Sequence, residues 1–146
     1  MARFSHSIEV VQPLEAVFPW LLEEDKVPRW MSHVEEYRQL GDGPLGVGSR
    51  LRQTIELSDS RVSFELEVLR YEPPREAEAR FATNGVEVVN VYTCEPAGAG
   101  TRVTQAMDAK PTSLSARVLI PVVRPRLERK LTEDLERLRA VLEAGG

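Results

Sequence analysis

Hydrophobic and polar residues alternate along most of the first three quarters of the chain, and a period of two is typical of half-buried β-strands. The clearest segment is VSFELEVLRY, residues 62–71, where one face carries Val62, Phe64, Leu66 and Val68. The Asn84-Gly85 pair between two further segments, EAEARFAT and VEVVNVYTCEP, is a strong hairpin signal. With the opening segment FSHSIEVV, the pattern predicts about seven strands, most of them joined by hairpins and therefore antiparallel.

A helical period of three to four residues replaces the alternation after Gln12. Pro13 occupies a first-turn position there, where its missing N–H costs nothing, and an apolar stripe follows at Leu14, Val17, Phe18, Leu21 and Leu22. Pro19 falls inside this stripe, so the course of residues 16–22 stays open. A second short helix or turn is predicted over residues 24–30.

A long helix is predicted at the C-terminal end of the chain. Thr112 or Ser113 can cap it. Its apolar positions recur at spacings of three and four, at Ile120, Val123, Leu127, Leu131, Leu135, Leu138 and Leu142. Pro121 and Pro125 each remove a backbone donor and should bend or split its first part.

The stretch GDGPLGVG, residues 41–48, contains the spacing G-x-G-x-x-G that some dinucleotide-binding loops share. Such a loop must lead from a strand into a helix, because the helix N-terminus holds the pyrophosphate. Here the next residues, SRLRQTIEL, alternate as a strand does, and the segment before the loop alternates as well. The glycines are therefore interpreted as the connection of a β-hairpin.

Composition limits the classes of protein to consider. At 146 residues the chain is most simply one domain, spanning residues 1–146, and is long enough to bury a core without disulfides. Its net charge of -4 argues against general nucleic-acid binding. The single cysteine, Cys94, excludes an intramolecular disulfide and a multi-cysteine metal site. The sequence shows neither a signal-peptide pattern nor an apolar run near the roughly 20 residues of a membrane span, so we expect a cytoplasmic protein.

Several stretches spread over nearly the whole chain resemble one known family. They are IEVVQPLEAVFPWLLEEDKVPRWMSHVEEY, GPLGVGSRLR, GAGTRVT and LERKLTEDLERLRAVLE. Together with the order of elements, they resemble the polyketide cyclase/dehydrase and lipid-transport group of the START-like (SRPBCC, Bet v 1-like) superfamily. This resemblance implies an α+β helix-grip fold, in which a curved antiparallel sheet of about seven strands wraps around the long C-terminal helix, with two short helices after the first strand.

The resemblance also implies a mainly apolar cavity between the sheet and the long helix, which relatives use to hold lipids, polyketides, sterols or quinones. Alternation predicts its walls at Leu51, Ile55, Phe64, Leu66 and Met107, with Trp30 and Leu127 closing it from the helix side. Four polar side chains fall on or near apolar faces: Gln53, Asn90, Tyr92 and Gln105. Each is interpreted either as a ligand contact or as a buried group with a structural hydrogen-bond partner.

Residues that could support catalysis are scarce. His6 and His33 lack triad or metal-ligand spacing and are predicted to lie on the surface. Cys94 is interpreted as a small buried hydrophobic residue, and Asp108 as a turn residue at a strand end. The leading hypothesis is therefore binding of a small hydrophobic molecule, without cofactor or metal. The alternative is a cyclase, aromatase or dehydrase acting on a polyketide-like substrate in the same cavity, which leaves open whether the chain is an enzyme.

Two surface interpretations remain. The segment RPRLERK, residues 124–130, gathers four cations that could meet anionic lipid, whereas the following LTEDLE supplies carboxylates for i,i+4 pairs such as Lys130 with Asp134. A solvated helix face is the favoured interpretation of that segment. A protein-interaction module would need an exposed apolar patch, and the sequence shows no uninterrupted one.

Overall fold

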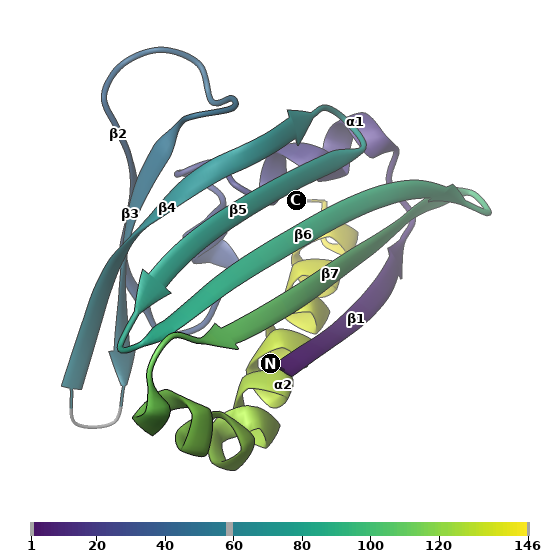
Figure 1. Cartoon of the computed structure of the whole chain (residues 1–146). Helices are drawn as coiled ribbons and strands as arrows, with labels where there is room; N and C mark the ends of the chain where they lie inside the picture. Colours follow the sequence, from purple (N-terminus) through teal and green to yellow (C-terminus); the bar gives the residue numbers. More distant parts are fainter. Residues whose placement is uncertain (1, 58–59, 146) are drawn as a thin grey trace.

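Seven antiparallel strands form one curved sheet, and the C-terminal helix lies on its concave side (Figure 1). The computed structural model describes residues 2–57 and 60–145. The strands are β1 (Ala2–Val10), β2 (Val34–Leu40), β3 (Arg50–Leu57), β4 (Ser60–Glu72), β5 (Glu76–Thr83), β6 (Val86–Ala97) and β7 (Gly100–Pro111). Their spatial order is β1-β7-β6-β5-β4-β3-β2, so the sheet is a meander except that β1 pairs with the last strand. The predicted helix-grip fold is confirmed.

The register of the strands places the inward-facing residues in rows across the sheet. On β4, Phe64 and Leu66 lie opposite Gln53 and Leu51 of β3. On the other half of the sheet, Tyr92 of β6 lies opposite Gln105 of β7 and Asn90 lies opposite Met107. Side chains directly opposite each other in an antiparallel pair share a face, so these polar and apolar groups all point toward the helix.

The segment between β1 and β2 contains shorter helices than the apolar stripe predicts. Helix α1 covers only Leu14–Val17, with Pro13 at the N-cap position, and 3₁₀ turns follow at Phe18–Trp20 (η1) and Val27–Arg29 (η2). Pro19 has no N–H to donate to an i−4 carbonyl, which explains why the α-helix does not continue through it. Two side chains fix the segment to the core: the Trp30 indole donates to the Trp20 carbonyl at 2.8 Å, and the Tyr37 hydroxyl donates to the Leu22 carbonyl at 2.8 Å.

Helix α2 spans Leu114–Glu143. Ser113, one of the two residues predicted as its cap, accepts a 3.2 Å hydrogen bond from the backbone N–H of Ala116. The helix is not split at its prolines, but its first turns run in a different direction from the rest, which is the predicted bend (Figure 1). Its last turns are fixed to the sheet, because Gln12 donates to the Leu142 carbonyl at 3.0 Å and accepts from Thr101 through its own carbonyl at 2.7 Å.

Residues 41–49 connect β2 to β3, so the glycine-rich stretch is a hairpin connection. Gly41, Gly43 and Gly48 all have positive φ angles, a conformation that costs glycine little and other residues more. No helix follows the stretch, since β3 begins at Arg50. The interpretation as a hairpin rather than a phosphate-binding loop is confirmed.

Candidate functional site

A cavity of about 410 Å³ lies between the concave side of the sheet and α2. Apolar side chains make up most of its walls, including the stacked rings of Phe64 and Phe81, whose centroids are 4.1 Å apart. Its lining also includes exposed residues at one end, Asn84 in the β5–β6 turn and Leu119 and Arg126 on the first half of α2. We take this end as the mouth. The large inward side chains Trp30 and Phe64 line the cavity without filling it.

Most of the residues predicted for the site do line this cavity. They are Trp30, Gln53, Ile55, Phe64, Leu66, Asn90, Tyr92, Gln105, Met107 and Leu127. Leu51 does not, because it is fully buried within the hydrophobic core instead. Phe81 and Val88 also line the cavity and were missed, although Phe81 shares the inward face of β5 with Ala77 and Ala79.

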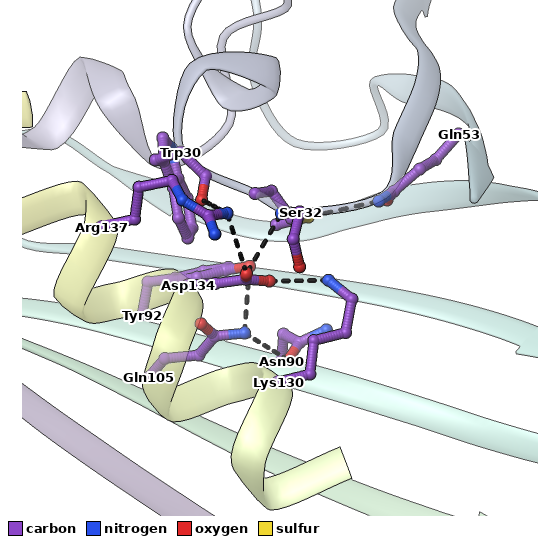
Figure 2. Close-up of polar contacts among 10 residues, drawn as sticks. Trp30, Ser32, Gln53, Asn90, Tyr92, Gln105, Lys130, Asp134 and Arg137 are labelled. Atoms are coloured by element: carbon purple, nitrogen blue, oxygen red, sulfur yellow. Dashed lines mark hydrogen bonds and ion pairs between the residues drawn. The ribbon is translucent and has the colours of Figure 1, made fainter. Parts of the chain in front are cut away.

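Three polar side chains form a hydrogen-bonded group on the cavity wall. The Gln105 amide nitrogen, Nε2, donates to Asn90 Oδ1 at 2.9 Å and to the Tyr92 hydroxyl at 3.4 Å (Figure 2). Burial raises the pKa of Tyr92, and the negative charge of Asp134 raises it further, so the phenol keeps its proton. Among the described residues, Asn90 Nδ2 and Gln105 Oε1 find no hydrogen-bond partner, and both can serve a molecule in the cavity.

Asp134 is a further buried polar residue of the lining, with 4% of its surface exposed. Lys130 donates to its Oδ2 atom at 2.6 Å, the backbone N–H of Ser32 donates to Oδ1 at 3.1 Å, and Arg137 lies 3.6 Å from Oδ1 (Figure 2). The predicted i,i+4 pair of Lys130 with Asp134 is therefore formed, but at the cavity wall rather than on a solvated face. The carboxylate at the cavity wall is therefore paired with two cations.

Sequence reasoning missed Asp134 as a site residue although a signal was present. Asp134 follows Leu131 by three positions and precedes Leu138 by four, so helical spacing puts its side chain on the apolar face of α2. A carboxylate on such a face needs partners, and Ser32 is one that comes from a distant part of the chain.

Gln53 lies on the opposite side of the cavity from the Asn90 group. Its Nε2 atom donates to the sulfur of Met31 at 3.2 Å. A thioether is a weak acceptor, so this contact satisfies the amide only partly. The side chain is buried and belongs to the lining. Gln53 therefore adds a second place where an amide can meet a polar group inside a mostly apolar cavity.

The residues considered for catalysis lie outside this group. His33 is exposed, as predicted, but His6 is half-buried because its Nε2 atom lies 2.9 Å from Glu136 on α2. Cys94 is buried, and burial raises the pKa of its thiol to about 12. Asp108 lies within β7 rather than in a turn, and its Oδ1 atom is buried without a hydrogen-bond partner. Among the described residues, no group of three or more His, Cys, Asp or Glu side chains could hold a metal ion.

The sequence matches one protein-family model over residues 1–143, described as "Polyketide cyclase / dehydrase and lipid transport". The chain belongs to this family. The match covers the sheet and all of α2, so the cavity is built from residues inside the matched range. No curated protein matches the chain significantly.

Several solved structures share the fold of this chain. TTHA0849 from Thermus thermophilus has a TM-score of 0.80 at 16% identity, with 99% of this chain and 100% of that chain covered. The di-domain ARO/CYC StfQ from the steffimycin biosynthetic pathway has a TM-score of 0.78 at 14% identity, covering 99% of this chain and 52% of StfQ. Ara h 8.0201 has a TM-score of 0.73 at 9% identity, with 98% of each chain covered. At these identities the likeness is one of fold.

A helix that spans a membrane is long and has a high mean hydropathy. No helix in the part of the chain that the structure describes is long and apolar enough to cross a bilayer.

Proposed function

We propose that the protein binds a small hydrophobic molecule with a neutral, oxygen-bearing end in the cavity between the sheet and α2. The observation that carries this proposal is the group of Asn90, Tyr92 and Gln105 in an otherwise mostly apolar wall. A cavity of about 410 Å³ falls within the range of pockets that hold small molecules. Apolar walls with a few oriented polar groups are the usual composition of such pockets.

The polar groups of the wall suit an uncharged oxygen-bearing ligand end better than a cationic one. Tyr92 keeps its proton and, since its oxygen accepts from Gln105, its own O–H is free to donate to a carbonyl or hydroxyl oxygen. Asn90 Nδ2 is a second donor on the same wall. Asp134 is already paired with Lys130 and Arg137, so a cationic ligand end gains no unpaired carboxylate there. A quinone, a polyketide-like ketone or a lipid alcohol has suitable chemistry.

Native mass spectrometry of the purified full chain, followed by denaturation and extraction, tests this proposal. We expect a bound mass whose extract contains an apolar molecule with carbonyl or hydroxyl groups. A second measurement is titration with 1,4-naphthoquinone, because Trp30 lines the cavity and its fluorescence should be quenched on binding. The variant Met107→Phe narrows the cavity and should weaken the quenching, whereas Val11→Phe, on an exposed position, should not. Equal quenching of both variants would contradict binding in the cavity.

A second candidate function is cyclisation or dehydration of a polyketide-like substrate, and one feature of the site favours it. Tyr92 can donate to a substrate carbonyl while the Asp134 carboxylate, on the same cavity, is within reach as a proton acceptor if Lys130 moves away. StfQ, the di-domain ARO/CYC protein, shares the fold. Incubation with a poly-β-ketone thioester should then give a cyclic product. The variant Asp134→Asn should form this product more slowly. If the thioester binds but is not converted, only the binding function proposed above remains.

A further inference from the structure

The first turns of α2 carry an exposed apolar stripe. Leu114, Val118 and Val122 are spaced four residues apart and are 78%, 74% and 73% exposed. Helical geometry puts residues four apart on one side of a helix, so the three side chains form a continuous row. Leu119 is also exposed and adjoins the row. Figure 1 shows these turns at the lower edge of the molecule, beyond the strands.

Cations surround this stripe. Residues 114–130 contain the cations Arg117, Arg124, Arg126, Arg129 and Lys130 against the single carboxylate Glu128, in a chain whose net charge is -4. Arg124 and Lys130 are engaged with Glu128 and Asp134. The other three, Arg117, Arg126 and Arg129, are exposed and have no carboxylate partner within the described part of the chain. Positive charge is thus concentrated next to exposed apolar surface, on an otherwise acidic protein.

We propose that this face, made of Leu114, Val118 and Val122 with Arg117, Arg126 and Arg129, docks reversibly on an anionic lipid surface. Apolar side chains that enter the acyl boundary, flanked by Arg residues that contact anionic headgroups, are how interfacial helices bind membranes. The distribution of charge favours an anionic bilayer as the partner. Such a surface attracts this segment and repels the rest of the chain, whose net charge is negative. The stripe is short, and binding is therefore expected to be weak and sensitive to salt.

The proposed docking face lies next to the mouth of the cavity. Leu119 and Arg126 belong to the lining of the cavity, at its exposed end. A protein docked through the first turns of α2 therefore turns the mouth of the cavity toward the lipid. The docking itself does not depend on the proposed ligand, so vesicle binding and ligand binding can succeed or fail separately.

Co-sedimentation of the full chain with vesicles tests the proposal. We expect binding to vesicles of phosphatidylcholine with phosphatidylserine, little binding to phosphatidylcholine alone, and release at high salt. Val118→Ser with Val122→Ser should abolish binding, and Arg129→Glu should weaken it by more than the roughly fivefold expected for loss of one cation. Circular dichroism verifies that each variant is folded.

Matched controls separate the proposed face from bulk properties. Val11→Ser with Val47→Ser removes two comparably exposed apolar side chains elsewhere, and Arg75→Glu makes the same charge change at an exposed turn. Neither should change vesicle binding by more than about twofold. The proposal is overturned if wild type does not bind the anionic vesicles, or if the controls weaken binding as much as the α2 variants. It is also overturned if light scattering shows a dimer that Val118→Ser with Val122→Ser converts to a monomer, since the stripe would then be covered in solution.

Discussion

Asp134 on α2 accepts a hydrogen bond of 3.1 Å from the backbone N–H of Ser32, a residue 102 positions earlier in the chain. The same carboxylate accepts from Lys130 at 2.6 Å. One buried side chain therefore fixes the middle of the long helix to the segment that precedes β2. Trp30 is fixed nearby by Arg137, which donates to its carbonyl at 3.2 Å. This side of the cavity is held by polar contacts as well as by packing.

Replacing Asp134 should destabilise the protein, because the Ser32 N–H loses its acceptor and a buried unpaired donor is costly. For Asp134→Ala we expect a loss of about 1–3 kcal/mol in the free energy of unfolding, measured by urea denaturation. Asp134→Asn is the matched control, since its carbonyl can still accept from Ser32, and it should lose less. Equal stability of Asp134→Ala and wild type would show that the contact is energetically unimportant.

Gln105→Leu should lower ligand affinity more than stability. The substitution removes the donor that orients Asn90 and Tyr92, and we expect binding of 1,4-naphthoquinone to weaken about tenfold, while the free energy of unfolding changes by no more than about 1 kcal/mol. Gln39→Leu makes the same chemical change on β2, outside the cavity lining, and should leave affinity unaltered. Identical affinities of Gln105→Leu and wild type would count against Gln105 as a contact.

Phe64→Asp should disrupt the fold. The ring is buried and stacked on Phe81, so the variant loses this packing and places a carboxylate among apolar groups. We expect a loss of at least about 3–5 kcal/mol, a large part of the stability of a domain of this size. Thermal unfolding followed by circular dichroism measures it, with the exposed neighbour Ser63→Asp as the control. A folded Phe64→Asp protein of unchanged melting temperature would contradict the described packing.

The contact between Glu136 and His6 predicts a stability difference that depends on pH. The hydrogen bond from His6 lowers the pKa of Glu136 below its usual value of 4.5, with Arg139 as a second contributor. The folded state therefore favours the ionised carboxylate, and this contribution is present above pH 4.5 and is lost as the pH falls through the lowered pKa. Wild type should be more stable than Glu136→Gln near neutral pH, and the two should converge in acid. A difference that grows below pH 4.5 would refute this linkage.

Cys94 should be unreactive in the folded protein. Burial raises the pKa of its thiol to about 12, so very little thiolate is present at about pH 8, and the side chain is shielded from reagents. We expect 5,5′-dithiobis(2-nitrobenzoate) to modify it only after unfolding in guanidinium. The variant Asn84→Cys, at an exposed turn, supplies a positive control. Fast stoichiometric labelling of native wild type would contradict the buried position.

The strands and the long helix could be predicted from periodicity, because in each of them a repeated local pattern matches the direction of the core. Gln53 and Gln105 stood out for the same reason, as polar residues on apolar faces. Asp134 was assigned to a solvated i,i+4 pair, since its decisive partner, the Ser32 N–H, lies 102 residues away. The helical spacing of Asp134 from Leu131 and Leu138 indicated a buried position, but nothing local identified Ser32 as its partner.

The first turns of α2 show a second limit of periodicity. The apolar pattern continues through residues 114–122, yet Ile120 is buried while Val118 and Val122 are exposed. Which apolar residues of a helix are covered depends on how far the sheet extends beneath them. The sequence pattern predicts the helix but not where its contact with the sheet begins. For the same reason, the sequence pattern indicated no exposed apolar patch, although the structure has one on the first turns of α2.

Amide groups with unsatisfied hydrogen-bonding capacity in the cavity wall allow the protein to select ligands in two ways. They attract oxygen-bearing molecules and disfavour molecules that offer no hydrogen bond. A saturated hydrocarbon of suitable size would bury Asn90 Nδ2 without a partner and leave Gln53 Nε2 with only the weak acceptor of Met31, and an unsatisfied buried amide costs about 1–3 kcal/mol. A ketone or alcohol of the same shape avoids that cost by supplying acceptors or donors. The protein is therefore expected to exclude the plain alkyl chains that are abundant in any lipid environment, and to retain rarer oxygenated molecules of the same width.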